Sequence, residues 1–478
     1  MDSNTVLSYF KEITKIPRES GHEEQIIAYL KEFAHSHNLA YKEDEVGNVL
    51  ITKPASKGKE NLPTIVLQSH TDMVCEKNYG VEHDFSKDPI NYVIEDGWMI
   101  AKDTTLGADC GIGVAAALAI LDSDLELGTI ECLFTVEEET GLDGAKALKE
   151  NFFNGKLLIN LDSEDEGELF VGCAGGLDTT AKFMYSTVDC PENYKLIRFE
   201  ITNAIGGHSG DDIDKGRANS LQLLAVFLYT QLDKNPYIYK FEGGNKRNAI
   251  ARESYAIIAL PSNEIETSIT EFQSYAKDTK AEYLSVEPDL KFTAVESSEH
   301  PNDLISLEES RNIILSLTSC PHGVLAMSND IKGLVDTSTN LASLKMVEKG
   351  VLRVGTSQRS TITSARRAAG AKVRSNFLLA GAVVTHESEY PGWHPNMDSE
   401  LLKVSVRSYE KLFGIKPIVR AIHAGLECGL FLDKYPDLDM ISFGPTLRGV
   451  HAPGERLDLA TLVKFTDLLV DVLLNPQM

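Results

Sequence analysis

Five residues in this sequence, two histidines and three carboxylates, have the types and the surroundings of ligands for a pair of metal ions. They are His70, Asp109, Glu139, Asp162 and His451. Imidazole nitrogens and carboxylate oxygens bind zinc in catalytic sites, where one position stays open for water. Two metal ions about 3.5–4 Å apart can polarise a carbonyl and lower the pKa of bound water towards about 7. The chemistry predicted from this set is the hydrolysis of an amide by an activated water.

Each ion needs a histidine and a carboxylate of its own, and one further carboxylate must bridge the two ions. We assign the bridge to Asp109. His70 and Asp162 would complete one ion, and Glu139 and His451 would complete the other. The same ligand types also suit manganese or cobalt, so the sequence predicts two divalent ions, with Zn²⁺ preferred over Mn²⁺ or Co²⁺.

Two more carboxylates would support the ligands. Glu138 stands beside a ligand without being one, and would act as the general base that takes a proton from water. Asp72, two residues after His70, would orient that imidazole. A single Asp or His at the end of a strand is more often structural or solvated than catalytic. The prediction therefore depends on five such positions occurring in one chain.

The elements that must position these residues alternate between strands and helices. An amphipathic helix is expected over 6–16, and a capping box at Ser20-Gly21-His22-Glu23 predicts a second helix ending near His37. Apolar runs predict a buried helix over 111–122 and strands near 47–53, 64–69, 90–94, 97–101, 129–136 and 157–161. Several of these runs end directly at a candidate site residue. This pattern is typical of an α/β sheet, which binds ligands at the carboxyl ends of its strands.

The composition changes after the glycine-rich stretch 172–176. We predict a catalytic domain formed by 1–176 and 390–478, interrupted by an inserted α+β domain over 177–389. The insertion reads as strand–strand–helix–strand–strand–helix twice, over roughly 178–280 and 290–385, which suggests two similar lobes. Because His451 lies in the last segment, that segment must return to the first.

The gross composition excludes several classes of protein. Lys+Arg is 46 against Asp+Glu 71, a formal net charge of −25, which disfavours nucleic acid and anionic membranes as partners. The start of the sequence carries no secretory signal, and no apolar stretch has the length of a membrane span. The seven cysteines form no CxxC pair. Reduced thiols in the cytoplasm are therefore expected rather than a disulfide framework.

Several motifs resemble the di-zinc peptidase family of carboxypeptidase G2, aminoacylases and carnosinases. They are Ser69-His70-Thr71-Asp72-Met73-Val74, Gly107-Ala108-Asp109-Cys110-Gly111, Glu138-Glu139-Thr140-Gly141 and Leu161-Asp162. Within this family the chain is most similar to the bacterial aminoacyl-histidine dipeptidases. Those added matches are Ile16-Pro17-Arg18, Gly206-Gly207-His208-Ser209-Gly210, Arg247-Asn248-Ala249-Ile250, His423-Ala424-Gly425-Leu426-Glu427-Cys428-Gly429 and Phe443-Gly444-Pro445-Thr446. The resemblance covers nearly the whole chain.

The resemblance implies a di-zinc exopeptidase-like catalytic domain with a central mixed sheet, whose insertion is a lid that also forms a homodimer. It implies the ligand roles given above and a cis peptide bond between Asp109 and Cys110, although most members have Asn after the bridging Asp. In relatives the histidine that matches His208 polarises the scissile carbonyl, often from a partner subunit. The residues that would hold the terminal carboxylate of a small peptide are Asn248, Arg359 and Gly425. Whether His208 acts within its own chain or across a dimer stays open.

The function expected from the resemblance is metal-dependent hydrolysis of unblocked dipeptides, Xaa-His and β-Ala-His among the candidates. A relative acting on tripeptides or N-acyl amino acids is the first alternative. A non-catalytic peptide-binding protein on the same scaffold is the second, although no ligand and no general base is missing. A metal-dependent phosphatase would want more basic residues near the metals. The glycines of 111–116 match a loose dinucleotide motif, but no apolar strand precedes them.

Overall fold

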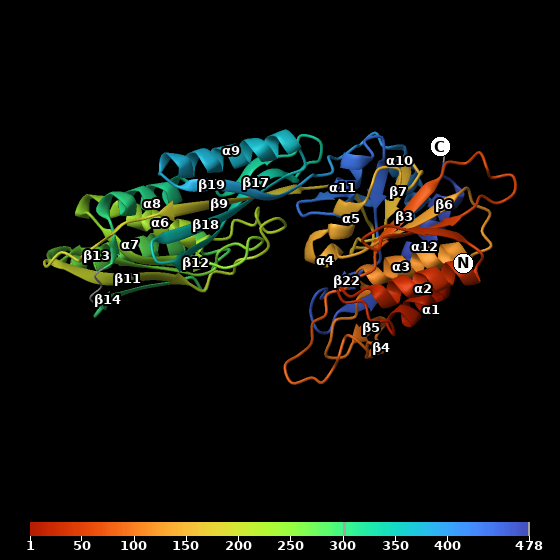
Figure 1. Cartoon of the computed structure of the whole chain (residues 1–478), viewed down its shortest axis with the longest axis horizontal. Coiled ribbons are helices and arrows are strands. Elements are labelled where there is room, and N and C mark those ends of the chain that lie inside the picture. Colours follow the sequence, from red (N-terminus) through yellow and green to blue (C-terminus); the bar gives the residue numbers. More distant parts are fainter. Residues whose placement is uncertain (300–302, 477–478) are drawn as a thin grey trace. The chain divides into compact units, whose positions relative to one another are not determined.

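The computed structural model of the chain describes residues 1–299 and 303–476, and these divide into two compact units (Figure 1). The first unit contains Met1–Cys173, Trp393–Ala421 and the chain from Leu426 onward. The second contains Ala174–Gly392 together with the short stretch Ile422–Gly425. The segment expected as an insertion, 177–389, corresponds to most of the second unit. The return of four residues near 422 to that unit has no counterpart in the sequence pattern.

The first unit is built on a mixed eight-stranded sheet. Its order is β1 (Ala40–Glu43), β2 (Val49–Lys53), β6 (Ile130–Thr135), β3 (Ile65–His70), β7 (Leu157–Asn160), β21 (Asp439–Ser442), β8 (Glu168–Cys173) and β20 (Ile418–Ile422). Neighbours β6, β3, β7 and β21 run parallel, while β1, β2 and β8 pair antiparallel with their neighbours. The expected α/β fold with a central mixed sheet is confirmed.

The four parallel strands explain how distant parts of the sequence meet. His70 is the last residue of β3, Glu138 and Glu139 follow β6, and Asp162 follows β7. The chain that leaves β21 reaches His451. Since parallel strands place their carboxyl ends at one edge, four separate segments deliver their polar residues to the same place.

The helices of the first unit cover this sheet. They are α1 (Ser3–Ile13), α2 (Glu24–Ser36), α3 (Ala108–Asp122), α4 (Glu138–Gly141), α5 (Asp143–Ala147), α10 (Glu400–Phe413), α11 (Glu427–Lys434) and α12 (Leu459–Leu474). The helix α3 packs on β3 and is covered by α1, whereas α11 contacts α5 and β8. The segment 108–122 is buried almost throughout, as its small and apolar residues predict. Among the helices of the described residues, none has the length and apolar character that crossing a membrane requires.

A second, four-stranded sheet in the same unit holds the His451 loop. Its order is β22 (Leu447–Arg448), β23 (Arg456–Asp458), β5 (Trp98–Ala101) and β4 (Tyr92–Glu95). His451 lies in the turn between β22 and β23, in a left-handed conformation with φ of 62°. Because β23 pairs with β5, this turn is tied to the chain that leads into Asp109.

The expected capping box before α2 is wrong. The residue that caps α2 is Glu23, and its side chain makes no capping hydrogen bond. Ser20 instead donates its hydroxyl to the carboxylate of Asp72 at 2.7 Å. A long-range acceptor near the site therefore replaces the local one. The first helix is also displaced from the expected range, since α1 ends at Ile13.

The second unit is built on one nine-stranded sheet in which every described pairing is antiparallel. Its order is β14 (Lys291–Ser297), β11 (Tyr194–Thr202), β13 (Ser254–Pro261), β12 (Tyr237–Gly244), β17 (Val335–Glu348), β18 (Val351–Ser360), β9 (Gly175–Met184) and β19 (Val383–Tyr390), with β16 (Gly323–Met327) beside β17. Four helices contact this sheet, α6 (Ser220–Thr230), α7 (Ile265–Tyr283), α8 (Leu307–Ser319) and α9 (Thr363–Leu379). A small pair, β10 (Thr187–Val188) and β15 (Leu304–Ile305), stands apart.

The two lobes expected in this segment exist, but they are nested rather than consecutive. Strands β11, β12, β13 and β14 with helices α6 and α7 form one strand–helix–strand–strand–helix–strand lobe. The other lobe takes its first strand, β9, from before that lobe and its remaining elements from after it. The expected division into 178–280 and 290–385 is therefore wrong for β9, and also for β14, which lies in the second range but belongs to the first lobe. Pairing of Gly243 and Gly244 of β12 with β17 joins the lobes into one sheet.

Candidate active site

The carboxylate of Asp109 lies between the two candidate histidines. Its Oδ1 is 3.3 Å from Nε2 of His70, and its Oδ2 is 3.1 Å from Nε2 of His451. Each imidazole meets one further carboxylate: Nε2 of His70 is 3.2 Å from Asp162 Oδ1, and Nε2 of His451 is 3.0 Å from Glu139 Oε1. The five candidate ligands thus form two groups that share Asp109, with the same division that the sequence suggested.

These separations lie at or slightly below those of ligands that share an ion. Zinc bonds of about 2.0–2.2 Å in a tetrahedral arrangement place two ligands roughly 3.3–3.6 Å apart. Glu139 Oε1 and Asp162 Oδ1 are buried and have no hydrogen-bond partner among the described residues, although imidazole nitrogens are near them. No lysine or arginine in the described part of the chain pairs with either carboxylate. Buried acceptors without donors are the condition that a cation relieves, so these residues fit a pair of divalent ions.

The electrostatics of the cluster reflect this crowding of charge. Burial alone would lower the pKa of His70, but the carboxylates of Asp162, Asp109 and Asp72 raise it well above its usual range. The neighbouring carboxylates of Asp109 and Glu139 stabilise the charged ring of His451 and raise its pKa to about 11. Burial and nearby carboxylates raise the pKa of Asp162 to about 7, against the attraction of His70. Without bound cations, the cluster therefore holds protons that metal ions would replace.

Asp72 ties the ends of two strands together. Its carboxylate accepts hydrogen bonds from the backbone N–H groups of Glu138 and Glu139 at 3.0 and 3.1 Å. It also lies 3.3 Å from Nδ1 of His70. Although burial opposes it, these contacts lower the pKa of Asp72 to about 2. An ionised Asp72 therefore holds the His70 ring and the start of α4, and its role in supporting a metal ligand stays a prediction.

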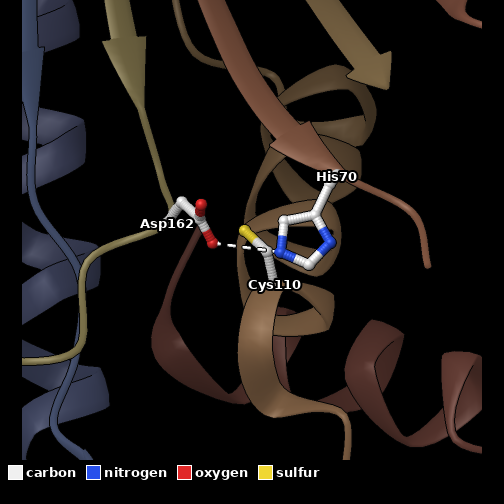
Figure 2. Close-up of side chains that lie close together, drawn as sticks. All are labelled: His70, Cys110 and Asp162. Atoms are coloured by element: carbon white, nitrogen blue, oxygen red, sulfur yellow. Dashed lines mark ion pairs between the residues drawn. The ribbon is translucent and has the colours of Figure 1, made fainter. Parts of the chain in front are cut away.

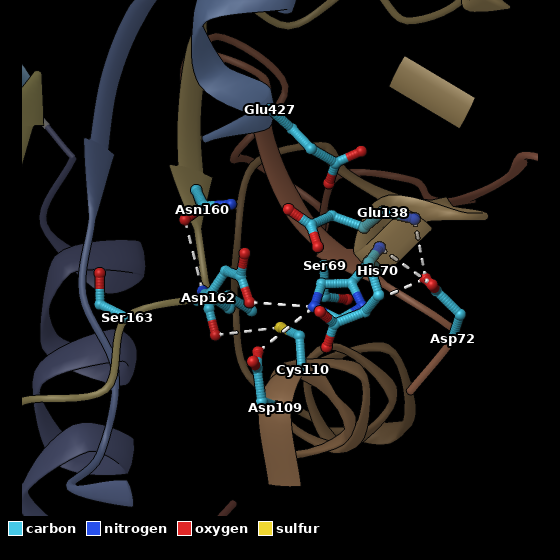
Figure 3. Close-up of polar contacts among 12 residues, drawn as sticks. Ser69, His70, Asp72, Asp109, Cys110, Glu138, Asn160, Asp162, Ser163 and Glu427 are labelled. Atoms are coloured by element: carbon cyan, nitrogen blue, oxygen red, sulfur yellow. Dashed lines mark hydrogen bonds and ion pairs between the residues drawn. The ribbon is translucent and has the colours of Figure 1, made fainter. Parts of the chain in front are cut away.

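The side chain of Glu138 reaches from α4 towards His70 and Asp162 (Figure 3). Burial, and the negative charges of Asp162, Glu427 and Glu139, raise its pKa well above the usual range, while His70 acts in the opposite sense. A carboxylate whose pKa is raised is a stronger base towards the proton of a water molecule, as a general base requires. The role of Glu138 as that base stays a prediction.

Cys110 lies beside the ligands without the character of one. Figure 2 shows its sulfur between His70 and Asp162, and the ligand atoms of the three lie within 4.8 Å of one another. Burial, reinforced by the charge of Asp162, raises the pKa of the Cys110 thiol well above its usual range. The thiol donates to the carbonyl oxygen of Leu161 at 3.3 Å. Since a metal binds the thiolate, these contacts favour a structural role. The Asp109–Cys110 peptide bond is cis, as predicted.

Two buried charges that received no role from the sequence hold the loop before Asp109. The carboxylate of Glu455 accepts hydrogen bonds from four consecutive backbone N–H groups, those of Leu106, Gly107, Ala108 and Asp109, at 2.7, 2.9, 2.8 and 3.3 Å. The guanidinium of Arg18 donates to the carbonyl oxygens of Thr71, Asp72 and Gly107. Arg18 therefore links the loop after His70 to the loop before Asp109. The motif Ile16-Pro17-Arg18 was the one available sequence signal.

A third buried ionisable residue, Glu427 at the start of α11, also received no role in the sequence analysis. It accepts hydrogen bonds from Gln68 and from Thr135 at 2.8 Å, and its other oxygen has no described partner. Burial raises its pKa to about 8. Figure 3 shows it on the Glu138 side of the cluster.

The four remaining candidates all lie in the second unit, along one chain of contacts. The ring of His208 accepts at Nδ1 from the backbone N–H groups of Gly210 and Asp211, at 3.3 and 3.2 Å. Its Nε2 is then a hydrogen-bond donor in the neutral and in the charged ring alike. The carbonyl oxygen of Asn248 accepts from the backbone N–H of Ser209 at 2.8 Å, and the Asn248 side chain is exposed.

Arg359 and Gly425 complete this chain through Tyr390. Arg359 is 7% exposed, and it donates to the Tyr390 hydroxyl at 3.2 Å and to Ser209 at 3.4 Å. A side chain at Gly425 would meet the Tyr390 ring at 3.0 Å, so glycine permits this close packing. The structure therefore groups His208, Asn248, Arg359 and Gly425 within one unit, and groups the metal-ligand candidates within the other.

The fold and this cluster define a class: an α/β protein that carries a cluster of candidate metal ligands at the carboxyl edge of the parallel strands in a mixed sheet. Residues 66–475 match the family described as Peptidase family M20/M25/M40. The chain belongs to this family, whose members are metal-dependent peptidases. The family resemblance inferred from the motifs is confirmed.

Two relatives match over almost the full chain. The cytosol non-specific dipeptidase of Escherichia coli (strain K12) is 37% identical over 466 residues, covering 97% of this chain and 96% of the relative. The crystal structure of an aminoacylhistidine dipeptidase from Vibrio alginolyticus superposes with a TM-score of 0.91 at 38% identity, covering 99% of this chain and 96% of that one. The aminopeptidase PepT from Bacillus cereus, at 18% identity and a TM-score of 0.58, shares the fold, with 99% and 98% covered.

Proposed function

We propose that this peptidase is a metal-dependent dipeptidase that hydrolyses unblocked dipeptides, Xaa-His and β-Ala-His among them. The observation that carries the proposal is the position of Asp109, each of whose oxygens faces a different histidine, as a ligand that bridges two ions would. The relatives that match nearly the full chain are a dipeptidase and an aminoacylhistidine dipeptidase. We further propose that the protein acts in the cytosol.

The ions that we propose are two Zn²⁺ per chain, with Mn²⁺ or Co²⁺ as substitutes that the same ligands accept. His70, Asp109 and Asp162 would hold one ion, and Asp109, Glu139 and His451 the other. When bound, the ions polarise the scissile carbonyl and lower the pKa of a water molecule.

The protein's own residues move the protons. The raised pKa of Glu138 suits it to take the proton of the attacking water as the new carbon–oxygen bond forms. The same carboxyl then gives that proton to the leaving nitrogen as the carbon–nitrogen bond breaks. Nε2 of His208, which is a donor in either protonation state, would bond to the carbonyl oxygen, where negative charge develops.

We propose that the second unit recognises the carboxylate of the dipeptide. Arg359 is a buried guanidinium whose described partners are two neutral hydroxyls. Arginine binds carboxylates through a planar fork of donors. The exposed side chain of Asn248 and the backbone at Gly425 would contribute to the same end of the substrate. The homodimer through this unit stays a prediction, which light scattering of the purified protein would test.

The test is hydrolysis of a panel containing β-Ala-His, Ala-His, Leu-Gly, Ala-Ala-Ala and N-acetyl-Met. Each is assayed with the protein as purified, after a chelator, and after zinc or manganese is restored. Chelator-sensitive cleavage confined to the dipeptides is the expected result. Cleavage of the tripeptide or of the acetylated substrate in preference would move the chain to the tripeptidase or N-acyl amino acid hydrolase alternative. Binding without cleavage under every metal would support the peptide-binding alternative.

A further inference from the structure

The guanidinium of Arg359 has no anionic partner among the described residues, which indicates a binding site for an anion. The guanidinium is buried, yet its described hydrogen bonds go to the hydroxyls of Ser209 and Tyr390, which carry no charge. No carboxylate in the described part of the chain forms an ion pair with it. A buried cation without a counter-ion is costly, so the site is arranged for an anion that arrives from outside.

Two carboxylates, those of Asp178 and Asp211, are close enough to Arg359 to interact with its charge, but their ion pairs are with other residues. Asp178 pairs with Arg247 at 2.5 Å, and Asp211 lies 3.4 Å from Nδ1 of His208. Neither carboxylate forms a described ion pair with Arg359, although the charge of Arg359 acts to lower the pKa of both.

The backbone explains why Arg359 stands in this position. Side chains alternate between the faces of a strand. Gln358 of β18 lies on the face of α9, where a side-chain carbon at Gly370 would come within 3.8 Å of it. Arg359 therefore projects from the opposite face. Ser209, from the loop after β11, and Tyr390, from the end of β19, meet it there.

The direction of the hydrogen bonds leaves two hydroxyl hydrogens available. Arginine can only donate, so the oxygens of Tyr390 and Ser209 act as acceptors towards Arg359. Each hydroxyl keeps its own hydrogen, and no described residue accepts it. Three side chains with unused donors, one of them positively charged, therefore meet at one point.

The Tyr390 ring is fixed so that its hydroxyl has one direction. A side-chain carbon at Gly176 would lie 2.3 Å from the ring, and one at Gly425 would lie 3.0 Å from it. The ring thus fits between two stretches of backbone that carry no side chain. Fixing a donor in advance lowers the entropic cost of binding.

We infer that Tyr390 and Ser209 complete the carboxylate site of Arg359, with Tyr390 as a specificity-determining residue that donates its hydroxyl to the free carboxylate of the dipeptide. The inference rests on the proposed dipeptidase function. Such a site would distinguish a dipeptide with a free C-terminal carboxylate from its C-terminal amide. The amide has one neutral acceptor oxygen, and its N–H₂ group would face the donors of the site. The site therefore selects a free acid over an amide.

The experiment compares Leu-Gly with its C-terminal amide as substrates for the metal-loaded enzyme and for Tyr390→Phe, which removes only the hydroxyl. A hydrogen bond to a charged group corresponds to roughly 10- to 100-fold in binding. For Leu-Gly we expect KM to rise by about that factor with kcat changed less, and for the amide we expect little change. Ser209→Ala should act in the same direction. Tyr229→Phe, at a half-exposed tyrosine of α6 in the same unit, is the matched control and should equal wild type.

A second measurement separates substrate contact from structural support. In an Arg359→Ala background, Tyr390→Phe should lose most of its effect on KM, since the two side chains act on one carboxylate. Equal changes for the free acid and the amide, or unchanged discrimination in Tyr390→Phe, would overturn the inference. If wild-type protein hydrolyses no dipeptide, the proposed function fails first, and the two failures are distinct.

Discussion

Asp109 connects the two halves of the metal-ligand cluster, and its neighbours show what each half requires. Burial would raise the pKa of this carboxyl, yet hydrogen bonds from His451 and His70 hold it well below its usual range. The group therefore stays ionised throughout the neutral range, and its single negative charge is shared by the two oxygens. Glu138 has the opposite character, since burial among other carboxylates raises its pKa. The surroundings of these two carboxyls thus shift their pKa values in opposite directions, which suits the proposed roles of Asp109 as a ligand and Glu138 as a proton carrier.

Removing the proton carrier should stop turnover without emptying the site. In Glu138→Gln the side chain keeps its shape and loses its basicity, so kcat should fall by roughly 10²- to 10⁴-fold. Metal content, measured by elemental analysis, should equal that of wild type, because Glu138 is beside the ligands and not among them. Near-normal kcat in this variant would remove Glu138 from the role of general base.

Asp72 should matter for metal affinity through His70. The substitution Asp72→Asn keeps the volume but weakens the contact with Nδ1 of His70 and the hydrogen bonds from Glu138 and Glu139. Loss of such a supporting contact weakens metal binding by about 10- to 100-fold. Titration of the metal-free protein with zinc, followed by calorimetry, measures this directly. Ser20→Ala, which removes another donor to Asp72, should give a smaller change of the same sign.

At the scale of elements, the loop that leads into α3 is the part most dependent on distant residues. Helical geometry is interrupted at Asp109 and Cys110, so the proposed bridging ligand lies before the regular part of the helix. The orphan N–H groups at this helix start are satisfied by Glu455, which follows the His451 turn in sequence. The segment between β22 and β23 thus contains the candidate ligand His451, and through Glu455 it also anchors the loop that precedes a second candidate ligand, Asp109.

Glu455→Gln should therefore lower stability and metal affinity together. The amide replaces one acceptor oxygen by a donor that faces backbone N–H groups, and hydrogen bonds to a charged group are worth about 1.5–3 kcal/mol each. We expect the free energy of unfolding of the metal-free protein to fall by at least about 2 kcal/mol, measured by urea denaturation. Glu166→Gln, at a carboxylate bound by Tyr409 and Lys464 away from this loop, serves as the comparison for metal affinity. Wild-type zinc affinity in Glu455→Gln would contradict the anchoring role.

At the scale of the whole molecule, the cluster links stability to pH and to metal. Burial raises the pKa of Asp162 to about 7 and those of Glu164 and Glu427 to about 8, while hydrogen bonds raise that of His451 to about 11. All four bind protons more tightly in the folded chain than in the unfolded one. Between about pH 5 and pH 9 the folded state therefore holds more protons, and its stability falls as pH rises.

Thermal unfolding of the metal-free protein should accordingly show a Tm that decreases from pH 6 to pH 9. Added zinc should raise Tm, and raise it more at pH 8 than at pH 6, because the ions replace the protons that the cluster otherwise needs. Differential scanning fluorimetry across this range, with and without a chelator, checks both statements. A Tm of the metal-free protein that increases over the same range would show that other groups dominate the linkage.

The sequence by itself determined the parts of this protein that depend on local pattern. Apolar runs that end at His70, at Glu137–Glu139 and at Asp162 identified three of the parallel strands and the edge at which they meet. The residue that follows the carboxyl end of a strand can be identified from the sequence alone, so these candidate ligands could be predicted without the structure. The motifs then supplied the family and the roles of His208 and Arg359, which no periodicity suggests.

Only the tertiary structure decided which distant groups act on one another. Ser20 looks like a helix cap in sequence, yet Asp72 is a stronger acceptor in space and takes its hydroxyl. The strand β9 precedes the other lobe in sequence, yet it joins its own lobe by pairing with β18 and β19, which the chain supplies only after that other lobe is complete. Glu455 and Tyr390 lie in none of the motifs from which the site was predicted. Their roles arise because a buried charge, or a donor with no acceptor, is satisfied by whatever the fold brings near.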